Sequence, residues 1–540
     1  MPVTKEEFVI LGREVTNILS ENYELLLQRM SSNIYETAGE DGPARRIYTY
    51  KYSENFKGIL YETVVINGQS VFVGLNPDAK TVEEELSTLD EINEGYRIIK
   101  PMPLQSHACR PYQFKDLEEL LHCLKKAHYE TIDTLYNKSK NIVMRYAAQE
   151  PNIQRLISID IVWSYFQDKF ATVHYDNIVG DNTSGKTAAG DTIEETAYRT
   201  VSMTDPSAAN VYRALGSLEP RQITIVLDEA EKINDFPDML AVLKTGYQLD
   251  KKIFKINTVV GYEQEFFYPY CYKFIISEKG LNDYKAKGVL DRTFSFNAKP
   301  GDPVDDIDIK EVITYGNDPS AIEDLFMQER YDEVVDFRNT MLLYRILHFR
   351  DKIVNIDVGV KRRNKQLVKP ILQLFYGTDA QKEVEETLQH FLELRKKRKE
   401  NTLEAYLLPM VLSWFGQNPT KDLVIEKTVA DIWTNTVKEL TGQPVPNNKL
   451  APNQIDNSEF NMIIYKTTIT SLLKDRFGAK PSRTEKARSL TLSYDTVSAV
   501  ADNYISKIKI ECTKKVYSRP QQKHDKNDNN DNVSDSRGVV

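Results

Sequence analysis

The sequence has few cysteines and no long hydrophobic run. Its four cysteines, Cys109, Cys123, Cys271 and Cys512, are scattered along 540 residues, which excludes a disulfide-rich scaffold and fits a reducing compartment. No apolar segment approaches the ~18 residues needed to cross a bilayer, and the chain opens with charged residues instead of a signal peptide. We therefore expect a soluble, cytoplasmic protein that makes no contact with a membrane.

The spacing patterns of several common sites are also missing. His107, Cys109, His122, Cys123 and His128 form a loose group, but it lacks the paired ligands at C-x₂₋₄-C spacing that structural zinc sites use. No Ser/His/Asp nucleophile motif and no dinucleotide-binding fingerprint occurs in the sequence. We therefore expect Mg²⁺ to be the only metal that this protein uses.

Positive charge is scarce over most of the chain. The formal net charge is −9, which excludes a uniformly basic protein that coats nucleic acid. Residues 441–515 are the exception, with twelve Lys or Arg against seven Asp or Glu, while residues 1–440 carry a net charge of −14. Any contact with nucleic acid must therefore be made by a local patch.

The length predicts several domains, since one ordinary core holds about 150 residues. A hydrophobic fraction of 41% and a charged fraction of 28% are typical of a folded protein. The patterns predict an N-terminal mixed α/β domain of unknown role (1–150), an α/β core (151–300), a helical unit (320–415), a smaller helix-rich unit (420–515) and a disordered tail (516–540).

Three patterns stand out in the N-terminal unit. Residues 6–30 have the spacing of an amphipathic helix. Two short β-rich runs, 58–66 and 70–74, are separated by Asn67-Gly68, which predicts a hairpin. Residues 114–136 again have apolar side chains at helical spacing. These patterns predict structure and leave the role of the unit open.

A phosphate-binding motif, G-x-x-x-x-G-K-[ST], is the strongest signal. It is made by Gly180, Asp181, Asn182, Thr183, Ser184, Gly185, Lys186 and Thr187. The glycines let backbone N–H groups turn toward phosphate oxygens, Lys186 would reach the outer phosphates, and the Thr187 hydroxyl would bind Mg²⁺. Residues 172–179 predict a strand before the motif and 186–197 a helix after it. The alternative, a solvated turn that matches by chance, does not explain these flanks.

A second motif combines a buried strand with two acids, the first of which, Asp228, lies 42 residues after Lys186. Residues 222–227 (QITIVL) predict a central strand of a parallel sheet, and Asp228 and Glu229 follow it. Asp228 would help to hold Mg²⁺, and Glu229 would polarise the attacking water. The alternative is a helix N-cap with an acid in its first turn. Together the two motifs predict binding of ATP with Mg²⁺.

With these motifs, residues 150–400 resemble AAA+ ATPases, in particular the helicase-like branch near superfamily 3 and the minichromosome-maintenance helicases. The resemblance implies a three-layer P-loop α/β core, a helical lid formed by residues 320–415, and a ring of identical chains with six as the expected number. It also implies that residues 251–258 and 264–268 form a hairpin that points into the ring. Lys251, Lys252 and Lys255 would contact phosphates there, unless this is an ordinary basic hairpin.

Three further roles rest on the same resemblance. Ser277, at the end of the run 271–277, corresponds to the polar residue that such enzymes place near the γ-phosphate. Arg292 corresponds to the arginine finger that acts on the ATP of a neighbouring subunit, with pairing to Asp291 as the alternative. Arg363 corresponds to the lid arginine that reaches back to the nucleotide, with Arg362 as its rival.

The C-terminal unit contains a basic cluster. Residues 461–477 predict an amphipathic helix that ends at Gly478, and residues 489–494 predict a strand. The basic residues around the helix exit are Lys466, Lys474, Arg476, Lys480, Arg483, Lys486 and Arg488. The arrangement resembles a winged helix that binds DNA with a steep salt dependence. A solvated basic face that contacts another protein is the alternative.

These observations predict an ATP-hydrolysing motor that acts on DNA, single- or double-stranded, as a helicase or translocase of the replication type. Two other functions stay open at this point. One is a DNA-bound regulator or loader that is switched by its nucleotide, and the other is an ATPase that remodels proteins. The predicted hairpin favours translocation, and the basic C-terminal cluster favours DNA binding.

Overall fold

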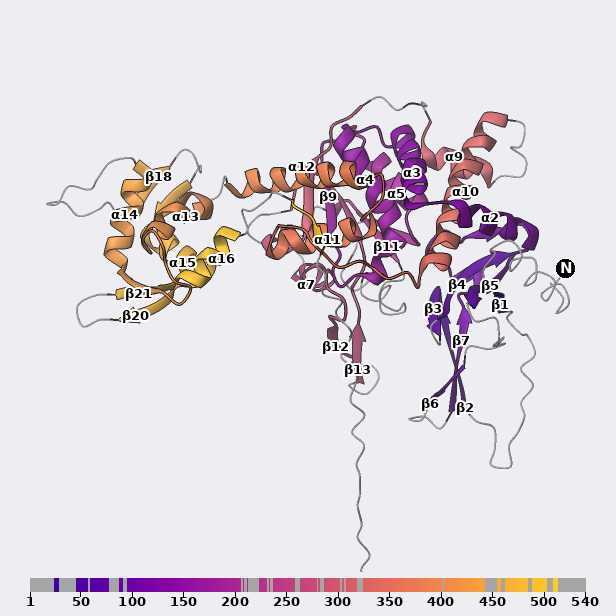
Figure 1. Cartoon of the computed structure of the whole chain (residues 1–540), viewed down its shortest axis with the longest axis horizontal. Coiled ribbons are helices and arrows are strands. Elements are labelled where there is room, and N and C mark those ends of the chain that lie inside the picture. Colours follow the sequence, from indigo (N-terminus) through magenta and orange to yellow (C-terminus); the bar gives the residue numbers. More distant parts are fainter. Residues whose placement is uncertain are drawn as a thin grey trace, which may run out of the picture.

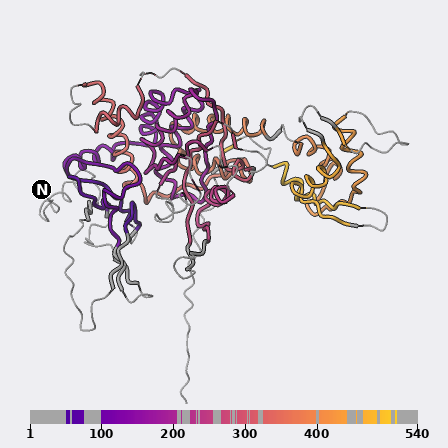
Figure 2. The backbone as a smooth tube through the Cα atoms, turned by 180° about the vertical axis from the view of Figure 1, so that it is seen from behind, coloured from indigo at the N-terminus to yellow at the C-terminus, as the bar shows by residue number. Residues whose placement is uncertain are grey.

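The structure is a computed structural model of the whole chain, and it shows two bodies with separate hydrophobic cores (Figure 1). The residues that it describes are 24–28, 45–56, 59–76, 87–90, 95–204, 207, 211, 223–230, 233, 237–257, 263–278, 280, 281, 286–301, 304, 307–317, 324–400, 403–441, 454–457, 462–483, 488–502 and 508–512. Figure 2 shows from behind that the smaller, C-terminal body stands apart from the larger one.

A five-stranded sheet lies at the centre of the larger body. Its order is β10 (Thr200–Thr204), β11 (Thr224–Asp228), β14 (Lys273–Ser277), β9 (Tyr175–Val179) and β15 (Thr293–Asn297). All four pairings are parallel, as expected for strands joined by crossover connections. The carboxyl ends of the strands therefore share one edge, which is where α/β sheets of this kind bind ligands.

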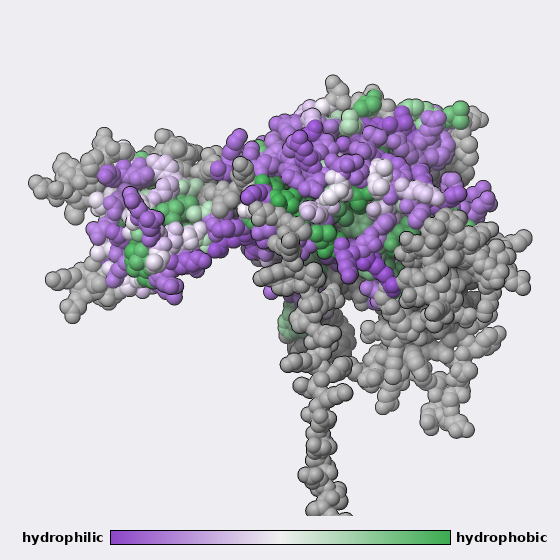
Figure 3. Space-filling view, viewed as in Figure 1, coloured by the Kyte–Doolittle hydropathy of each residue, from purple (hydrophilic) through white to green (hydrophobic). Residues whose placement is uncertain are grey.

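Helices cover this sheet and continue into the N-terminal part of the chain. They are α2 (Leu117–Tyr129), α3 (Ile132–Tyr146), α4 (Pro151–Ser164), α5 (Lys186–Thr196), α7 (Pro237–Thr245), α8 (Lys287–Leu290), α9 (Ile309–Gly316), α10 (Leu325–His348), α11 (Arg362–Leu374) and α12 (Gln381–Glu400). No helix among the described residues is both long and apolar enough to cross a membrane. Hydrophilic residues cover much of the described surface in Figure 3.

Local signals explain where α2 and α3 begin. The Asp116 side chain caps α2 by accepting a hydrogen bond from the Glu119 N–H, and Thr131 caps α3 in a reciprocal capping box with Thr134. The helical spacing at 114–136 is thus confirmed, but as two helices that meet at the Thr131 cap.

Strands dominate the described residues before α2. The first sheet contains β1 (Glu24–Gln28), β3 (Ser53–Phe56), β4 (Ile59–Ile66), β5 (Gln69–Asn76) and β8 (Gln113–Phe114). The second contains β2 (Arg45–Lys51), β6 (Ser87–Asp90) and β7 (Gly95–Pro101). The predicted hairpin is confirmed, because β4 and β5 are antiparallel and Asn67 and Gly68 have φ of 51° and 73°. The predicted helix over 6–30 is wrong at Glu24–Gln28, which pairs with β5; its remaining residues lie outside the described ones.

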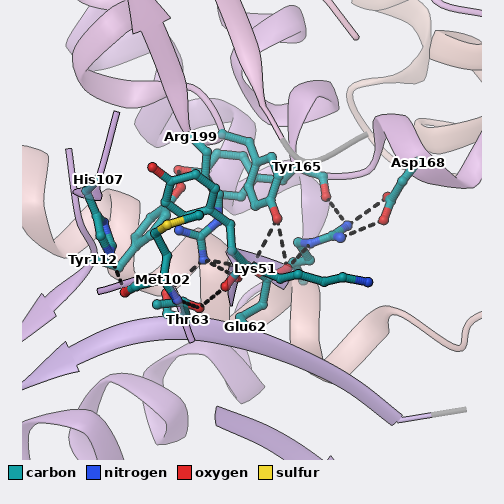
Figure 4. Close-up of polar contacts among 12 residues, drawn as sticks. Lys51, Glu62, Thr63, Met102, His107, Tyr112, Tyr165, Asp168 and Arg199 are labelled. Atoms are coloured by element: carbon teal, nitrogen blue, oxygen red, sulfur yellow. Dashed lines mark hydrogen bonds and ion pairs between the residues drawn. The ribbon is translucent and has the colours of Figure 1, made fainter. Parts of the chain in front are cut away.

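A buried ion network joins the N-terminal sheet to the rest of the larger body (Figure 4). Glu62 of β4 accepts hydrogen bonds from the Tyr198 hydroxyl, from Arg199 Nη2 at 2.8 Å and from Arg345 Nε at 2.8 Å. Arg345 also holds both carboxylate oxygens of Asp168, at 2.8 and 2.6 Å. Glu62, Arg199 and Arg345 are all buried. This network fixes the N-terminal sheet to α10 and to the start of β10.

One hydrophobic core extends from Tyr52 to Leu392. The N-terminal helices, the central sheet and helices α10 to α12 all contribute to it, so the predicted boundaries at 150 and 320 do not separate independent cores. The smaller core extends from Leu407 to Val500 and includes residues of α13 (Leu403–Ser413). Leu394 still packs on the larger core and Leu403 already packs on the smaller one, so the change lies earlier than the predicted limit at 415.

The smaller body alternates helices with an antiparallel sheet. Its elements are α13, β17 (Val424–Thr428), α14 (Val429–Thr441), β18 (Gln454–Asn457), β19 (Met462–Tyr465), α15 (Lys466–Phe477), β20 (Lys480–Arg483), β21 (Arg488–Ser493) and α16 (Tyr494–Ala501). The sheet order is β17-β21-β20, with both pairings antiparallel. The helix predicted over 461–477 begins only at Lys466, because residues 462–465 pair with β18 instead. It ends at Gly478 as predicted, with φ of 67°.

The chain returns to the larger body after α16. Strand β22 (Glu511–Cys512) pairs with β16 (Ile356–Asp357), and the Lys509 N–H donates to the Val358 carbonyl at 3.0 Å. In the sequence, the smaller body is thus inserted between two segments that belong to the larger one. The predicted unit 420–515 therefore ends with residues that belong to the larger body, and the tail 516–540 lies outside the described residues.

Candidate nucleotide-binding site

The predicted phosphate loop connects β9 to α5 at the carboxyl edge of the central sheet. Its entry is fixed because the Gly180 N–H donates to the Ser277 carbonyl of β14 at 3.2 Å. Thr183 and Gly185 both have left-handed backbones, with φ of 73° and 76°, and α5 begins at Lys186. The unpaired N–H groups of the first helical turn therefore face the loop, which makes it a site for anions.

Neither Gly180 nor Gly185 has room for a side chain, because other side chains lie close to both positions. A Cβ atom on Gly180 would lie 2.5 Å from the Ser184 Oγ, and one on Gly185 would lie 2.7 Å from the Gln149 Nε2. Gln149 itself ties the loop to the segment after β15, because its Nε2 donates to the Ser184 carbonyl and its Oε1 accepts from the Lys299 N–H, both at 2.8 Å. Sequence reasoning missed Gln149, which belongs to no motif.

The side chains of the loop divide into buried and exposed ones. Lys186 is buried and its Nζ donates to the Gly180 carbonyl at 2.8 Å, so it curls over the loop. The Ser184 Oγ is buried without a hydrogen-bond partner. The exposed residues are Asp181, Asn182, Thr183 and Thr187. The Ser184 hydroxyl and the first N–H groups of α5 can donate hydrogen bonds to phosphate oxygens, and Lys186 can add a positive charge. The loop is therefore suited to the phosphates of a nucleotide.

The two predicted acids lie at the same edge of the sheet. Asp228 is the last residue of β11 and accepts a hydrogen bond from the Glu229 N–H at 2.9 Å. Glu229 is exposed and has a left-handed backbone with φ of 50°.

A third acid, Asp191, lies one turn after Thr187 on α5 and was missed by sequence reasoning. Burial raises the pKa of Asp191 to about 6, and the nearby Asp228 carboxylate also raises it. Thr187 and Asp228 thus fit Mg²⁺, which prefers oxygen ligands.

Ser277 lies beside the loop, as the resemblance implies. It ends β14, which pairs with both β11 and β9, and it is buried. Its Oγ is 3.5 Å from the Asn177 Oδ1, a long contact that leaves the hydroxyl able to reorient. Asn177, a second buried polar residue at this place, is not part of any recognised motif.

Arg292 lies at the opposite, amino edge of the sheet. Its carbonyl accepts from the Tyr175 N–H at the start of β9, and its guanidinium stacks 4.1 Å from the Tyr247 ring centroid. Asp291, the alternative partner, pairs instead with Arg395 at 3.1 Å. Arg292 therefore cannot reach the phosphate loop of its own chain, whereas an action on a neighbouring chain is compatible with this position.

Arg363 lies at this amino edge too. Its guanidinium stacks 4.9 Å from the Tyr247 ring centroid and donates to the Gln366 Oε1 at 2.6 Å. Burial raises the pKa of Tyr247, but hydrogen bonds and the charges of Arg363 and Arg292 outweigh it and lower the pKa below its usual value. Arg363 therefore lies away from the phosphate loop of its own chain in this structure, because α11 begins at the far edge, and its role at the nucleotide stays a prediction. Its rival Arg362 faces Asp502 at 3.8 Å.

The predicted basic hairpin is formed by β12 (Ile253–Asn257) and β13 (Glu263–Phe267), which pair antiparallel and project from the larger body (Figure 1). Lys251 and Lys252 are exposed at its base, and Lys255 lies in β12, where only its backbone is described. Phe254 and Phe266, which sequence reasoning missed, are paired across the strands. They are 48% and 49% exposed, with ring centroids 5.6 Å apart.

The basic residues of the smaller body lie on and after α15. Lys474, Lys480 and Arg488 are exposed and Lys466 is half-buried, whereas Arg476 faces Glu404 at 3.7 Å. Arg483 pairs through its backbone with Arg488 across the β20–β21 hairpin, and Lys486 lies outside the described residues. Three exposed cations thus gather at the helix exit and the adjoining hairpin.

No known family model and no curated protein sequence matches this chain. The A-form apo structure of the NrS-1 C-terminal region is similar with 11% identity and a TM-score of 0.28, over 80% of this chain and 96% of that one. An active helicase, Cch of SCCmec type IV, is similar with 11% identity and a TM-score of 0.34, over 85% of this chain and 81% of that one.

Proposed function

We propose that this protein is an Mg²⁺-dependent ATPase of the AAA+ type that works on DNA, as a helicase or translocase. The observation that carries the proposal is the meeting of the phosphate loop and the Asp228-Glu229 pair at the carboxyl edge of one parallel sheet. The loop amides and Lys186 bind and neutralise phosphates, and Thr187 and Asp228 hold Mg²⁺. Glu229 orients the attacking water, and Ser277 lies where it can contact the terminal phosphate.

The position of Arg292 supports a ring of identical chains, with six as the proposed number. An arginine at the amino edge of one sheet serves the carboxyl edge of another if the chains pack head to tail. In such a ring Arg292 completes the neighbour's site as an arginine finger, a contribution of about 10³–10⁵ in rate.

Two surfaces support DNA as the partner. The β12–β13 hairpin presents Lys251 and Lys252 beside exposed aromatic rings, a combination that suits single strands. The smaller body follows the order of a winged helix, in which α15 is the reading helix and β20–β21 the wing. Its exposed Lys474, Lys480 and Arg488 are placed to contact backbone phosphates.

Steady-state ATPase assays test the proposal. We expect single- or double-stranded DNA to stimulate wild-type hydrolysis, and added salt to reduce this stimulation. Lys186→Ala should lower the rate by about 10²-fold or more. ATP hydrolysis that ignores DNA at both salt concentrations would favour protein remodelling instead. DNA-stimulated hydrolysis without strand separation or movement would favour the nucleotide-switched regulator.

Mixing two inactive variants tests the ring. Lys186→Ala lacks the loop lysine but keeps Arg292, while Arg292→Ala has the opposite defect. In a mixed ring some interfaces combine an intact loop with an intact finger, so the mixture should recover activity that neither variant has alone. No recovery in chains shown to exchange would exclude Arg292 as a finger that acts between chains.

A further inference from the structure

Three ionisable side chains outside the nucleotide site meet inside the larger body. Asp160 lies on α4, His174 directly precedes β9, and Asp176 lies within β9. All three are fully buried, and one ligand atom of each lies within 4.8 Å of the others. They bring two carboxyl groups and an imidazole together in a hydrophobic core.

Only three of the six polar side-chain atoms of Asp160, His174 and Asp176 take part in the hydrogen bonds described next. The His174 Nε2 lies 2.8 Å from the Asp160 Oδ1, and the Tyr272 hydroxyl donates to the Asp176 Oδ2 at 2.8 Å. The other atoms, Asp160 Oδ2, Asp176 Oδ1 and His174 Nδ1, are buried without a hydrogen bond of ordinary geometry, and the two carboxyl groups lie close enough to share a proton. Buried polar atoms normally have partners, so three orphans in one cluster call for a cation or a proton between them.

The surroundings offer no positive charge to balance the two acids. Among the described residues, no lysine or arginine forms an ion pair with Asp160 or Asp176. The walls are aromatic: the His174 ring lies 5.2 Å from Trp163, 5.3 Å from Tyr272 and 5.5 Å from Phe294, measured between centroids. Two carboxylates are very costly in such a place unless they are neutralised.

We propose that Asp160, His174 and Asp176 bind a buried divalent transition-metal ion of the zinc and manganese class. The two positive charges of a divalent ion neutralise the two carboxylates. A neutral imidazole is a nitrogen ligand that ions of this class accept. Ligands about 2.1 Å from one ion are at most about 4.2 Å apart, so the three ligand atoms, which lie within 4.8 Å of one another, need only a small movement to close on an ion. Mg²⁺ and Ca²⁺ fit less well because they prefer oxygen throughout.

The ion would serve the structure of the larger body. It would join α4 to β9, the strand that leads directly into the phosphate loop, and the Tyr272 hydroxyl would hold the Asp176 carboxylate in position. Because all three ligands are enclosed, the ion must enter while the chain folds. It is therefore distinct from the Mg²⁺ proposed for Thr187 and Asp228, which would come and go with the nucleotide.

Metal analysis of the full-length protein tests this. The chain is expressed without a histidine tag in medium supplemented with Zn²⁺ and Mn²⁺, then dialysed against chelator and analysed for metals by mass spectrometry. We expect about one zinc or manganese ion per chain to survive dialysis, as bound structural ions do. Wild-type protein with less than about a tenth of an ion per chain would overturn the proposal and leave a shared proton between Asp160 and Asp176.

Variants locate the ion. Asp160→Asn and Asp176→Asn keep the side-chain volume and should lower the retained metal at least about tenfold. Asp228→Asn is the matched control, since it removes a carboxylate from the nucleotide site and should keep the ion. If the variants do not fold, wild-type protein refolded with Co²⁺ should show the visible absorption of a bound ion. Equal metal in all variants, or no absorption with Co²⁺, would contradict the site.

Discussion

At the scale of single residues, unusual backbone conformations gather around the proposed nucleotide site. Thr183 and Glu229 are two of the six described non-glycine residues with positive φ, and Gly185 between them has positive φ as well. Left-handed conformations cost side-chain-bearing residues about 1–2 kcal/mol, and they persist where the surrounding structure holds them. The backbones of the loop and of Glu229 are thus held in these conformations by their neighbours.

Gly185→Ala tests how much the loop depends on this conformation. The new methyl group would meet the Gln149 side chain in addition to the strained φ of 76°, so we expect nucleotide affinity to fall about tenfold or more and stability to fall by ~1–2 kcal/mol. Binding of a fluorescent ATP analogue and thermal unfolding measure the two effects.

Gly377→Ala is the matched control for this change. Gly377 has φ of 81°, but nothing lies within 4 Å of a Cβ built there. It should cost a similar ~1–2 kcal/mol of stability and leave nucleotide binding intact. If both variants bind nucleotide equally well, the contact with Gln149 does not shape the loop.

At the scale of elements, the β12–β13 hairpin combines charge with exposed rings. Phe254 and Phe266 form a pair on its surface, and the Lys252 Nζ lies 5.5 Å from the Phe266 centroid and 5.0 Å from that of Tyr268. The hairpin therefore has the chemistry to stack on bases as well as to contact phosphates.

Phe254→Ala and Phe266→Ala should each weaken binding of single-stranded DNA by ~1–3 kcal/mol, because a stacking surface is lost. Fluorescence anisotropy with a labelled oligonucleotide measures this. Tyr129→Ala is the control, since Tyr129 is 69% exposed but lies on α2. Equal affinity in all three variants would show that the rings do not stack on bases.

The basic cluster of the smaller body gives a different expectation. Lys480→Ala and Arg488→Ala should each reduce the slope of log affinity against log salt by ~1, since each contact releases about one counterion. Lys421→Ala removes an exposed charge of the same body outside the cluster and should leave the slope unchanged. A slope that falls equally in all three variants would indicate a diffuse charge effect without a defined site.

Elements with a strong local signal could be predicted from sequence. The loop and the flanking β9 and α5 were identified because glycine spacing and an apolar strand encode them locally. The start of α15 could not be predicted, because residues 462–465 are taken by pairing with β18, a contact made elsewhere in the chain. The same holds for Glu24–Gln28, which pairs with β5.

At the scale of the whole molecule, the tertiary structure determines which residues lie near the proposed nucleotide site, and the sequence alone does not reveal this. Arg363 matches the expected place in the chain, yet α11 carries it to the amino edge of the sheet beside Tyr247. Asp160 and Asp176 meet although one is on a helix and the other on a strand, so no spacing pattern reveals them. Gln149 lies where a domain boundary was expected and instead supports the loop.

The junction around Glu62 tests whether the larger body unfolds as one unit. Glu62→Gln would leave Arg199 buried without a paired carboxylate and Arg345 paired with Asp168 alone, and we expect a loss of ~3–5 kcal/mol. Chemical denaturation followed by fluorescence measures it. Glu386→Gln, in the exposed pair with Lys382 at 4.0 Å, should cost less than ~1 kcal/mol. Similar losses in both variants would contradict a structural junction at Glu62.

The pairing of β16 with β22 has a mechanical consequence. The chain leaves the larger body after α12 and comes back to it at residues 508–512. The smaller body is therefore connected to the larger one through two segments of the chain. A pull on either body would therefore load two covalent connections instead of one.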